Sequence, residues 1–280
     1  MPDRLFLFAA YDPNCIIDDA LIYYVKTLSK HGDIILCTDC DFPKKEIDKI
    51  KKYTVHTINE RHGEYDFGSY KRAYQYASAK DILKNYKYLY LVNDSVFGPT
   101  IDIKQTLKNI ELLKTDAASI IISKHQTHKF MESWFVRINK KIFTSKWFND
   151  FMCEIKKEST KADVTIKYEH GLSNLITNNN CSWSGLYTVY GRETYNHPKH
   201  LFKQKCPFIK KVSFTRHNGA LGKQIKYILR NCDKSACDAI MKTANRLYGH
   251  QYMTWFLTSN PFKISARNIT YLIRKIRKQK

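Results

Sequence analysis

The chain has 280 residues, of which 43% are hydrophobic and 14% aromatic, so it can bury the core of one large domain, or of one domain with an appendage. Such a composition excludes a disordered chain. The 47 lysines and arginines against 26 aspartates and glutamates give a net charge of +21, which indicates an anionic partner such as nucleic acid, a phosphorylated ligand or an acidic membrane surface, without distinguishing between them.

Strands and helices alternate in the first part of the sequence. We expect strands at residues 5–11, 33–38, 53–58 and 88–92. We expect helices from Asp18 or Asp19 to Gly32, at residues 43–52 and at residues 69–83. This order predicts a parallel sheet whose strands are joined by right-handed crossovers.

The second part of the sequence begins with a turn at Gly98-Pro99. A helix is expected at residues 102–113, followed by strands at residues 117–123 and 131–138 and an amphipathic helix at residues 146–157. A further helix is expected to begin near Glu169 and to end near Asn178, before a last strand at residues 186–190. From about His197 the composition shifts to Lys, Arg, Asn and Cys without a clear period. We therefore expect a domain at residues 1–212 and a looser, basic, helical C-terminal region at residues 213–280.

The sequence shows no secretory signal, because the apolar run at residues 5–10 is short and is flanked by Asp3 and Asp12. No apolar run reaches the roughly 18 residues of a membrane span. We therefore expect a cytoplasmic protein. Eight cysteines at uneven spacing then favour reduced thiols over a disulfide framework. The less favoured alternative is a zinc site formed by Cys37, Cys40, Cys232 and Cys237.

Residues 87–99, KYLYLVNDSVFGP, place polar groups where a ligand could bind. The uncharged run at residues 88–92 is typical of a strand buried on both faces of a parallel sheet. Asn93, Asp94 and Ser95 follow it directly, at the carboxyl end where open α/β sheets bind their ligands. A carboxylate at this position contributes little to packing and is well placed for chemistry.

Five segments together resemble successive blocks of the rhamnan synthesis protein F family of bacterial glycosyltransferases. They are RHGEYDFGSYKRA (residues 61–73), YLVNDSVFGP (90–99), HKFMESWFV (128–136), YEHGLSNLI (168–176) and PFIKK (207–211). The resemblance implies an α/β, GT-A-like fold with a mainly parallel central sheet flanked by helices. It also implies transfer of rhamnose or another deoxysugar from a nucleotide sugar such as dTDP-rhamnose. The acceptor would be a lipid-linked or polysaccharide chain of a growing cell-surface polysaccharide or lipopolysaccharide.

The resemblance also implies a divalent cation, Mg²⁺ or Mn²⁺, at the donor diphosphate. GT-A enzymes commonly use an Asp-x-Asp motif after a central strand, whereas this sequence has Asn93-Asp94-Ser95. Asp94 is thus the one full carboxylate, and diphosphate oxygens and waters would complete the coordination. This departure leaves the dependence on metal open.

Five residues are candidate donor-binding groups, by position and by the resemblance: Arg61, Asp66, Asn93, Ser95 and Lys211. Arg61 could pair with phosphate through its planar guanidinium, and Asp66 could accept hydrogen bonds from ribose or sugar hydroxyls. The alternative is a structural loop in which Asp66 caps the following helix. Lys210 and Lys211 could face the diphosphate or the solvent.

Glu169 is the candidate catalytic base, since a carboxylate at a helix start could take the proton of an acceptor hydroxyl, with Asp94 as the second catalytic residue. The alternative is a first-turn Glu favoured by the helix dipole. His128, Glu132 and Ser133 are expected to line the acceptor side. His125 and His128 resemble a metal-binding pair only superficially.

The final twenty residues, 261–280, contain seven lysines or arginines and no acid. On a helix, Ile269, Leu272, Ile273 and Ile276 would share one face, and Arg267, Arg274, Lys275, Arg277 and Lys278 the other. This pattern favours peripheral contact with an anionic membrane at its cytoplasmic face. The alternative is a helix packed on its own domain with a solvated basic face.

Two other functions are compatible with the composition. The charge and the nineteen tyrosines would suit a nucleic-acid-binding protein, but the basic residues are scattered and no binding motif appears, so we expect no nucleic-acid partner. The incomplete Asp-x-Asp motif would suit a non-catalytic scaffold of a polysaccharide assembly complex.

Overall fold

The structure of the chain is a computed structural model that describes residues 3–125, 128–216, 220–266 and 269. It contains two compact units. The first unit consists of Met1–Asp94 and Ile103–Gly191, and the second of Ser95–Asp102 and Arg192–Lys280. The predicted boundary between residues 212 and 213, which sets off a basic C-terminal region, stays a prediction.

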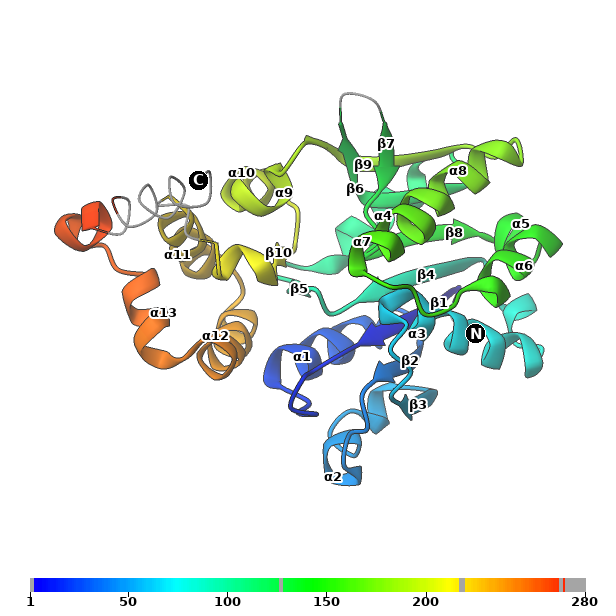
Figure 1. The fold of residues 1–280 in the computed structure, drawn as a ribbon, viewed down its shortest axis with the longest axis horizontal. Helices are drawn as coiled ribbons and strands as arrows, with labels where there is room; N and C mark the ends of the chain where they lie inside the picture. Colours follow the sequence, from blue (N-terminus) through cyan, green and yellow to red (C-terminus); the bar gives the residue numbers. More distant parts are fainter. Residues whose placement is uncertain (1–2, 126–127, 217–219, 267–268, 270–280) are drawn as a thin grey trace. The chain divides into compact units, whose positions relative to one another are not determined.

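An eight-stranded sheet forms the centre of the first unit (Figure 1). Its strands are β1 (Arg4–Ala10), β2 (Asp33–Asp39), β3 (His56–Glu60), β4 (Tyr88–Asn93), β6 (Ala117–Lys124), β7 (Lys129–Met131), β8 (Phe135–Asn139) and β9 (Trp183–Tyr190). β3, β2, β1 and β4 are parallel neighbours in that order, and β9 is parallel to β6. β8 is antiparallel to β4 and β6, and β7 is antiparallel to β6. The predicted α/β class with a mainly parallel central sheet is confirmed.

The apolar strands have both faces covered, which explains why they do not alternate with polar residues. Leu5 and Leu7 belong to a core cluster shared with the helices α3 (Tyr65–Ala79), α5 (Lys140–Phe143), α6 (Lys146–Glu154), α7 (Lys161–Val164) and α8 (Gly171–Asn178). Phe6 and Phe8 point to the other face, where the ring of Phe8 lies 5.1 Å from that of Tyr24 in α1 (Asp19–Leu28). Asp18 caps α1, as predicted, by accepting a hydrogen bond from the Leu21 N–H. Two further helices complete the unit: α2 (Lys44–Ile47) and α4 (Ile103–Leu112).

Several element boundaries differ from the sequence-based ones. The strand predicted at residues 131–138 is two strands, β7 and β8, because the chain bends between them at residues 132–134. The helix predicted to start near Glu169 begins earlier, at Lys161, and residues Thr165–His170 form a π-helical turn between α7 and α8. α3 begins at Tyr65 rather than at Ser69, β3 runs from His56 to Glu60, and β9 begins at Trp183.

The second unit contains one short strand pair and several helices. β5 (Val96–Phe97) is antiparallel to β10 (Ile209–Lys210), and the helices are α9 (Glu193–Asn196), α10 (Pro198–Lys203), α11 (Leu221–Asn231), α12 (Lys234–Tyr248) and α13 (His250–Phe256). Phe97, Phe214, Ile225, Ile240 and Phe256 are buried in it. The expectation of a looser region is therefore wrong for this part of the chain, and the expectation of helices is confirmed. Most of the basic tail predicted as a membrane helix, residues 267–268 and 270–280, lies outside the described residues.

Across the described part of the chain, we find no helix with the length and apolarity that crossing a bilayer requires.

Arg137 in β8 is a buried cation that joins the sheet to the end of α4. Its side chain is almost fully buried, and its guanidinium donates to the carbonyl oxygens of Thr115, Ile110 and Leu113 at 2.9, 3.4 and 3.3 Å. Burial lowers the pKa of Arg137. The carbonyls at the end of α4 carry partial negative charge, which compensates the buried cation in place of a carboxylate.

Replacing Arg137 by Ala should lower the free energy of unfolding by about 3–5 kcal/mol, because several buried carbonyl oxygens would lose their donor. Urea unfolding followed by circular dichroism measures this loss. Lys108→Ala, an exposed change on α4, serves as the control and should stay within about 0.5 kcal/mol of the parent. A loss below about 1 kcal/mol for Arg137→Ala would contradict the structural role of this cation.

Candidate active site

Three aspartates lie at the carboxyl ends of neighbouring parallel strands. Asp12 comes two residues after β1, Asp39 ends β2, and Asp94 comes directly after β4. The register pairs Ala9 with Asn93, and Ala10 with Thr38, so these strand ends meet at one edge of the sheet. This is the edge at which open α/β sheets bind ligands.

Asp66 and Asn93, two of the predicted donor-binding residues, are in direct contact. The Asn93 side-chain amide donates to a carboxylate oxygen of Asp66 at 2.8 Å. Asp66 lies in the first turn of α3 rather than in the preceding loop, where a negative charge is favoured by the helix dipole. It is not the N-cap of α3, which is Glu64, so the capping alternative is not what the structure shows.

Glu169 and Ser133 form a second contact between predicted residues. One carboxylate oxygen of Glu169 accepts hydrogen bonds from the Ser133 N–H at 2.7 Å and from its hydroxyl at 2.8 Å. Glu169 lies in the π-helical turn and not at a helix start, so the reasons first given for it, a base at a helix start or a first-turn Glu, both rest on a wrong helix boundary. π-helical turns are frequent at functional sites, because the extra residue redirects neighbouring side chains.

Tyr70 in α3 connects these two contacts. It is fully buried, and its hydroxyl donates to the carbonyl oxygen of Ser133 at 3.1 Å. Burial raises the pKa of Tyr70 well above its usual value, and the carboxylates of Asp66 and Glu169 raise it further, although an Asn93 hydrogen bond opposes this shift. Tyr70 therefore stays protonated and remains a donor. The sequence did not single it out, because a buried tyrosine in a Tyr-rich helix resembles any core residue.

Asp94 is half-buried, and its backbone N–H donates to the Ala9 carbonyl at 3.2 Å. This bond fixes the residue beside the end of β1. Burial raises the pKa of Tyr24 in α1 well above its usual value, and the negative charge of the Asp94 carboxylate raises it further. The bond to Ala9 therefore holds Asp94 at the sheet edge between β1 and β4.

The predicted acceptor residues Glu132 and His128 lie in different surroundings. Glu132 is buried, and its two carboxylate oxygens accept from the Ser123 hydroxyl at 2.7 Å and from the Trp134 indole at 2.6 Å, which gives it a structural role in the bend between β7 and β8. His128 is exposed. Its ring lies 4.9 Å from that of His170, the residue after Glu169, so His128 reaches the π-helical turn.

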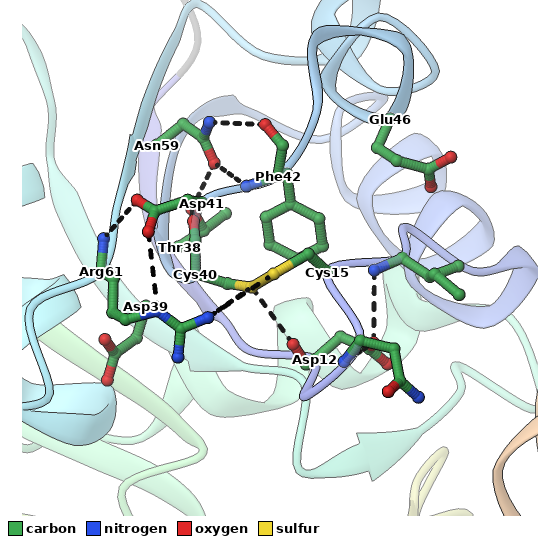
Figure 2. The surroundings of a disulfide bond; sticks show 12 residues. Asp12, Cys15, Thr38, Asp39, Cys40, Asp41, Phe42, Glu46, Asn59 and Arg61 are labelled. Carbon is green, nitrogen blue, oxygen red and sulfur yellow. Dashed lines mark hydrogen bonds and ion pairs between the residues drawn. A yellow bond between two sulfur atoms is a disulfide. The ribbon is translucent and has the colours of Figure 1, made fainter.

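Arg61 lies over a disulfide bond that the sequence did not predict (Figure 2). Cys15, after β1, is bonded to Cys40, after β2, so the expectation that all cysteines are reduced is wrong for this pair. The two residues are 25 positions apart in sequence, but the parallel pairing of β1 with β2 brings their Cα atoms to 6.0 Å. The bond also removes the alternative zinc site, because the Cys40 sulfur is no longer a thiolate.

The guanidinium of Arg61 is 3.7 Å from each sulfur of the disulfide and 3.6 Å from the Asp41 carboxylate. The loop that follows is held by Asp39, whose carboxylate accepts from the N–H groups of His62 and Gly63 at 2.8 and 2.7 Å. Figure 2 shows Arg61, Asp39 and Asp41 around the disulfide. Arg61, the predicted phosphate-binding residue, is thus anchored at the carboxyl ends of β2 and β3.

Ser95 and Lys211, the remaining predicted donor residues, lie together in the second unit. The Lys211 N–H donates to the Ser95 carbonyl at 2.9 Å, and the Lys210 ammonium donates to the Ser95 hydroxyl at 3.2 Å. The pairing of β5 with β10 places them side by side.

No group of three His, Cys, Asp or Glu side chains that could hold a metal ion occurs among the residues that the structure describes. Two of the nearby carboxylates already accept hydrogen bonds, Asp66 from Asn93 and Asp12 from the Asn14 and Ile16 N–H groups. Asp94, the predicted metal ligand, lies at the same sheet edge, and a single carboxylate suits an ion bound mainly by the oxygens of a diphosphate.

Comparison with solved structures gives distant similarities. A protein from Desulfovibrio desulfuricans described as a nucleotide-diphospho-sugar transferase has 17% identity and a TM-score of 0.40, with 82% of this chain and 98% of that chain covered. Core-mannan synthase A from Aspergillus fumigatus, in a form with Mn and GDP, has 11% identity, a TM-score of 0.38 and coverage of 69% and 73%. The glycosyltransferase GlyE from Streptococcus pneumoniae has 13% identity, a TM-score of 0.36 and coverage of 73% and 51%.

No curated protein matches the chain. A protein family does: residues 34–275 match the family described as Rhamnan synthesis protein F. This match spans most of the sequence and includes the β4 end with Asn93 and Asp94, the α3 start with Asp66, and the π-helical turn with Glu169. The chain belongs to the Rhamnan synthesis protein F family.

Proposed function

We propose that the chain is a glycosyltransferase. It would move a sugar, rhamnose or another deoxysugar, from a nucleotide-sugar donor to a growing cell-surface polysaccharide or lipopolysaccharide. The family name supports a part in rhamnan synthesis. The observation that carries the proposal is the set of contacts linking Asp66, Asn93, Tyr70, Ser133 and Glu169 beside the carboxyl end of β4.

The donor would bind through two kinds of contact. The hydrogen-bonded pair of Asp66 and Asn93 would take sugar or ribose hydroxyls, since a carboxylate fixed by an amide keeps acceptor capacity. Arg61 of the first unit would contact the phosphates, and Ser95 and Lys211 of the second unit stay predicted donor-binding residues. Departure of the nucleoside diphosphate increases the negative charge on its terminal phosphate, and fixed cationic groups stabilise that charge.

Asp94 would hold a Mg²⁺ or Mn²⁺ ion, which when bound would neutralise charge on the leaving diphosphate. The position of Asp94 beside the end of β1 is fixed by the hydrogen bond of its N–H to Ala9.

Glu169 would act as the base that takes the proton of the acceptor hydroxyl as this oxygen attacks the sugar carbon. Ser133 holds one of its oxygens with two hydrogen bonds, and Tyr70 holds Ser133 in turn. This chain of donors fixes the carboxylate, which proton transfer at short distance requires. His128 and Ser133 would lie on the acceptor side.

We propose that the enzyme works at the cytoplasmic face of a membrane, where a lipid-linked acceptor would be found, with a transferase domain at residues 1–212 and a membrane-associating region at residues 213–280. A second candidate function is a non-catalytic scaffold of a polysaccharide assembly complex, which the single carboxylate of the Asn93-Asp94-Ser95 motif favours. The net charge of +21 would also suit a nucleotide- or nucleic-acid-binding protein. A binding titration with dTDP, UDP and a single-stranded oligonucleotide separates nucleic-acid binding from nucleotide binding. Transfer predicts binding of a nucleoside diphosphate and none of the oligonucleotide.

Asp94→Ala should reduce transfer by at least ~10³-fold, because the substitution removes the carboxylate proposed to hold a cation at the leaving diphosphate. The thermal midpoint should change little, because Asp94 follows the strand and is half-exposed. Transfer is measured with purified protein, and Asp48→Ala, an exposed acid after α2, is the control. Retained turnover in folded Asp94→Ala would rule out the assignment. If the parent protein still turns over in the presence of a chelator, transfer requires no metal ion, and the loss of activity in Asp94→Ala would then be due to the carboxylate itself.

Glu169→Gln should lower kcat by ~10²–10⁴-fold with little change in donor KM, as removal of a general base does. The Gln carbonyl oxygen can still accept both hydrogen bonds from Ser133, so the local structure is kept. Steady-state kinetics across pH measure the effect. A near-normal rate at every pH would transfer the role to another carboxylate, with Asp66 the next candidate.

A further inference from the structure

The charge of the chain is concentrated in the second unit. Residues 95–102 and 192–280 contain 20 lysines and arginines against 4 aspartates and glutamates, a net charge of +16 out of +21 for the whole chain. The first unit, with 27 against 22, carries +5. The anionic partner that the composition indicates should therefore be sought at the second unit.

α11 presents a basic face opposite its buried one. Lys223, Lys226 and Arg230 follow one another at spacings of three and four residues, so they lie on one side of the helix. The other side buries Leu221, Ile225 and Ile228. Within the described residues, none of these three cations is paired with a carboxylate.

α10 extends this face. The ammonium of Lys199 lies 4.2 Å, and that of Lys203 5.9 Å, from the ring centre of Tyr227 in α11. The Phe202 ring meets the same tyrosine edge-on at 6.4 Å. We define the α10–α11 basic surface by six residues: Lys199, Lys203, Lys223, Lys226, Tyr227 and Arg230.

An exposed apolar side chain follows at the border of the α10–α11 basic surface. The Lys226 ammonium donates to the Ser259 hydroxyl at 2.7 Å, which attaches the segment after α13 to α11. Three residues further on, Phe262 is 84% exposed, more than any other large hydrophobic side chain among the described residues. Cations without carboxylate partners next to a solvated phenylalanine are typical of proteins that lie on a membrane surface.

We propose that the α10–α11 basic surface, together with Phe262, docks on an anionic lipid bilayer. The cations would attract the headgroups, and the phenyl ring would enter the headgroup boundary. A single phosphate ligand fits poorly, because Lys223 and Arg230 are separated by about 10 Å along the helix. A nucleic acid is less favoured as well, since the ammonium of Lys199 lies 4.2 Å from the Tyr227 ring centre and so competes with a base for stacking there.

This inference deepens the proposed function, since a lipid-linked acceptor would be met at the same membrane. Vesicle binding is measured without donor or acceptor, so a failure of the docking proposal is distinguishable from a failure of the transferase proposal.

The test is cosedimentation of the full chain with phosphatidylglycerol-containing vesicles and with pure phosphatidylcholine vesicles. The variant replaces Lys199, Lys203, Lys223 and Lys226 by Gln and should bind anionic vesicles roughly 10²–10³-fold more weakly. The control replaces four exposed lysines of the first unit, Lys30, Lys45, Lys51 and Lys52, by Gln, which changes the net charge equally. It should bind almost as the parent does.

Phe262→Ser, an exposed change that leaves the core intact, should also weaken binding to anionic vesicles, and added salt should release the parent. Equal binding by the parent and the α10–α11 variant would overturn the proposal, as would equal losses in the two quadruple variants. Salt-resistant binding of the parent to phosphatidylcholine vesicles would overturn it too.

Discussion

The pairing of β4 with β1 on one side and with β8 on the other determines where the polar residues after β4 can lie. β4 is buried along almost its whole length, and the chain leaves the sheet only after Asn93. The N–H of Asn93 still bonds to the Trp134 carbonyl and that of Asp94 to the Ala9 carbonyl, at 3.2 Å each. Backbone hydrogen bonds to Trp134 on one side and to Ala9 on the other therefore fix Asn93 and Asp94 at the sheet edge. The positions from which their side chains extend are fixed as well.

The rest of the site is fixed by donors that cannot easily lose their protons. Tyr70 is held neutral chiefly by burial, which raises its pKa, and also by the charges of two carboxylates, so its bond to Ser133 persists across the physiological pH range. Ser133 in turn fixes the Glu169 carboxylate, to which its N–H and its hydroxyl donate hydrogen bonds. The polar groups are thus held by the fold before any ligand binds, which lowers the entropic cost of binding and reaction.

Part of this arrangement was predictable from sequence, for identifiable reasons. Asn93 and Asp94 stand out because an apolar run ends at them, and strand ends at the carboxyl edge are predictable from the alternating order of elements. Asp66 and Asn93 are both predicted at this edge, although the sequence places Asp66 in a loop and the structure places it in the first turn of α3. The π-helical turn around Glu169 could not be predicted from the sequence, because one inserted residue changes the helical spacing of the hydrophobic residues too little to be recognised.

Other features depend on distances that sequence does not reveal. The bond between Cys15 and Cys40 needs the parallel register of β1 and β2, and uneven spacing suggested the opposite. Glu132 was grouped with the acceptor residues, although Ser123 and Trp134 occupy both its oxygens in the bend after β7. The short helices α9, α10 and α13 of the second unit were not recognised, because four to seven residues give too few periods.

The hydrogen bond between Glu169 and the Ser133 backbone N–H also protects the edge of the sheet from pairing with strands of other molecules. In the described sheet β7 pairs only with β6, and the chain after it presents N–H groups on its other side. Ser173, one helical turn after Glu169, accepts from the Met131 N–H at 3.0 Å, so the two side chains satisfy alternate N–H groups of this edge. Open edges of this kind recruit strands from other molecules and promote aggregation. Glu169 is thus constrained as an edge cover, apart from the catalytic role proposed for it, and only residues with an acceptor oxygen at that reach can replace it without opening the edge.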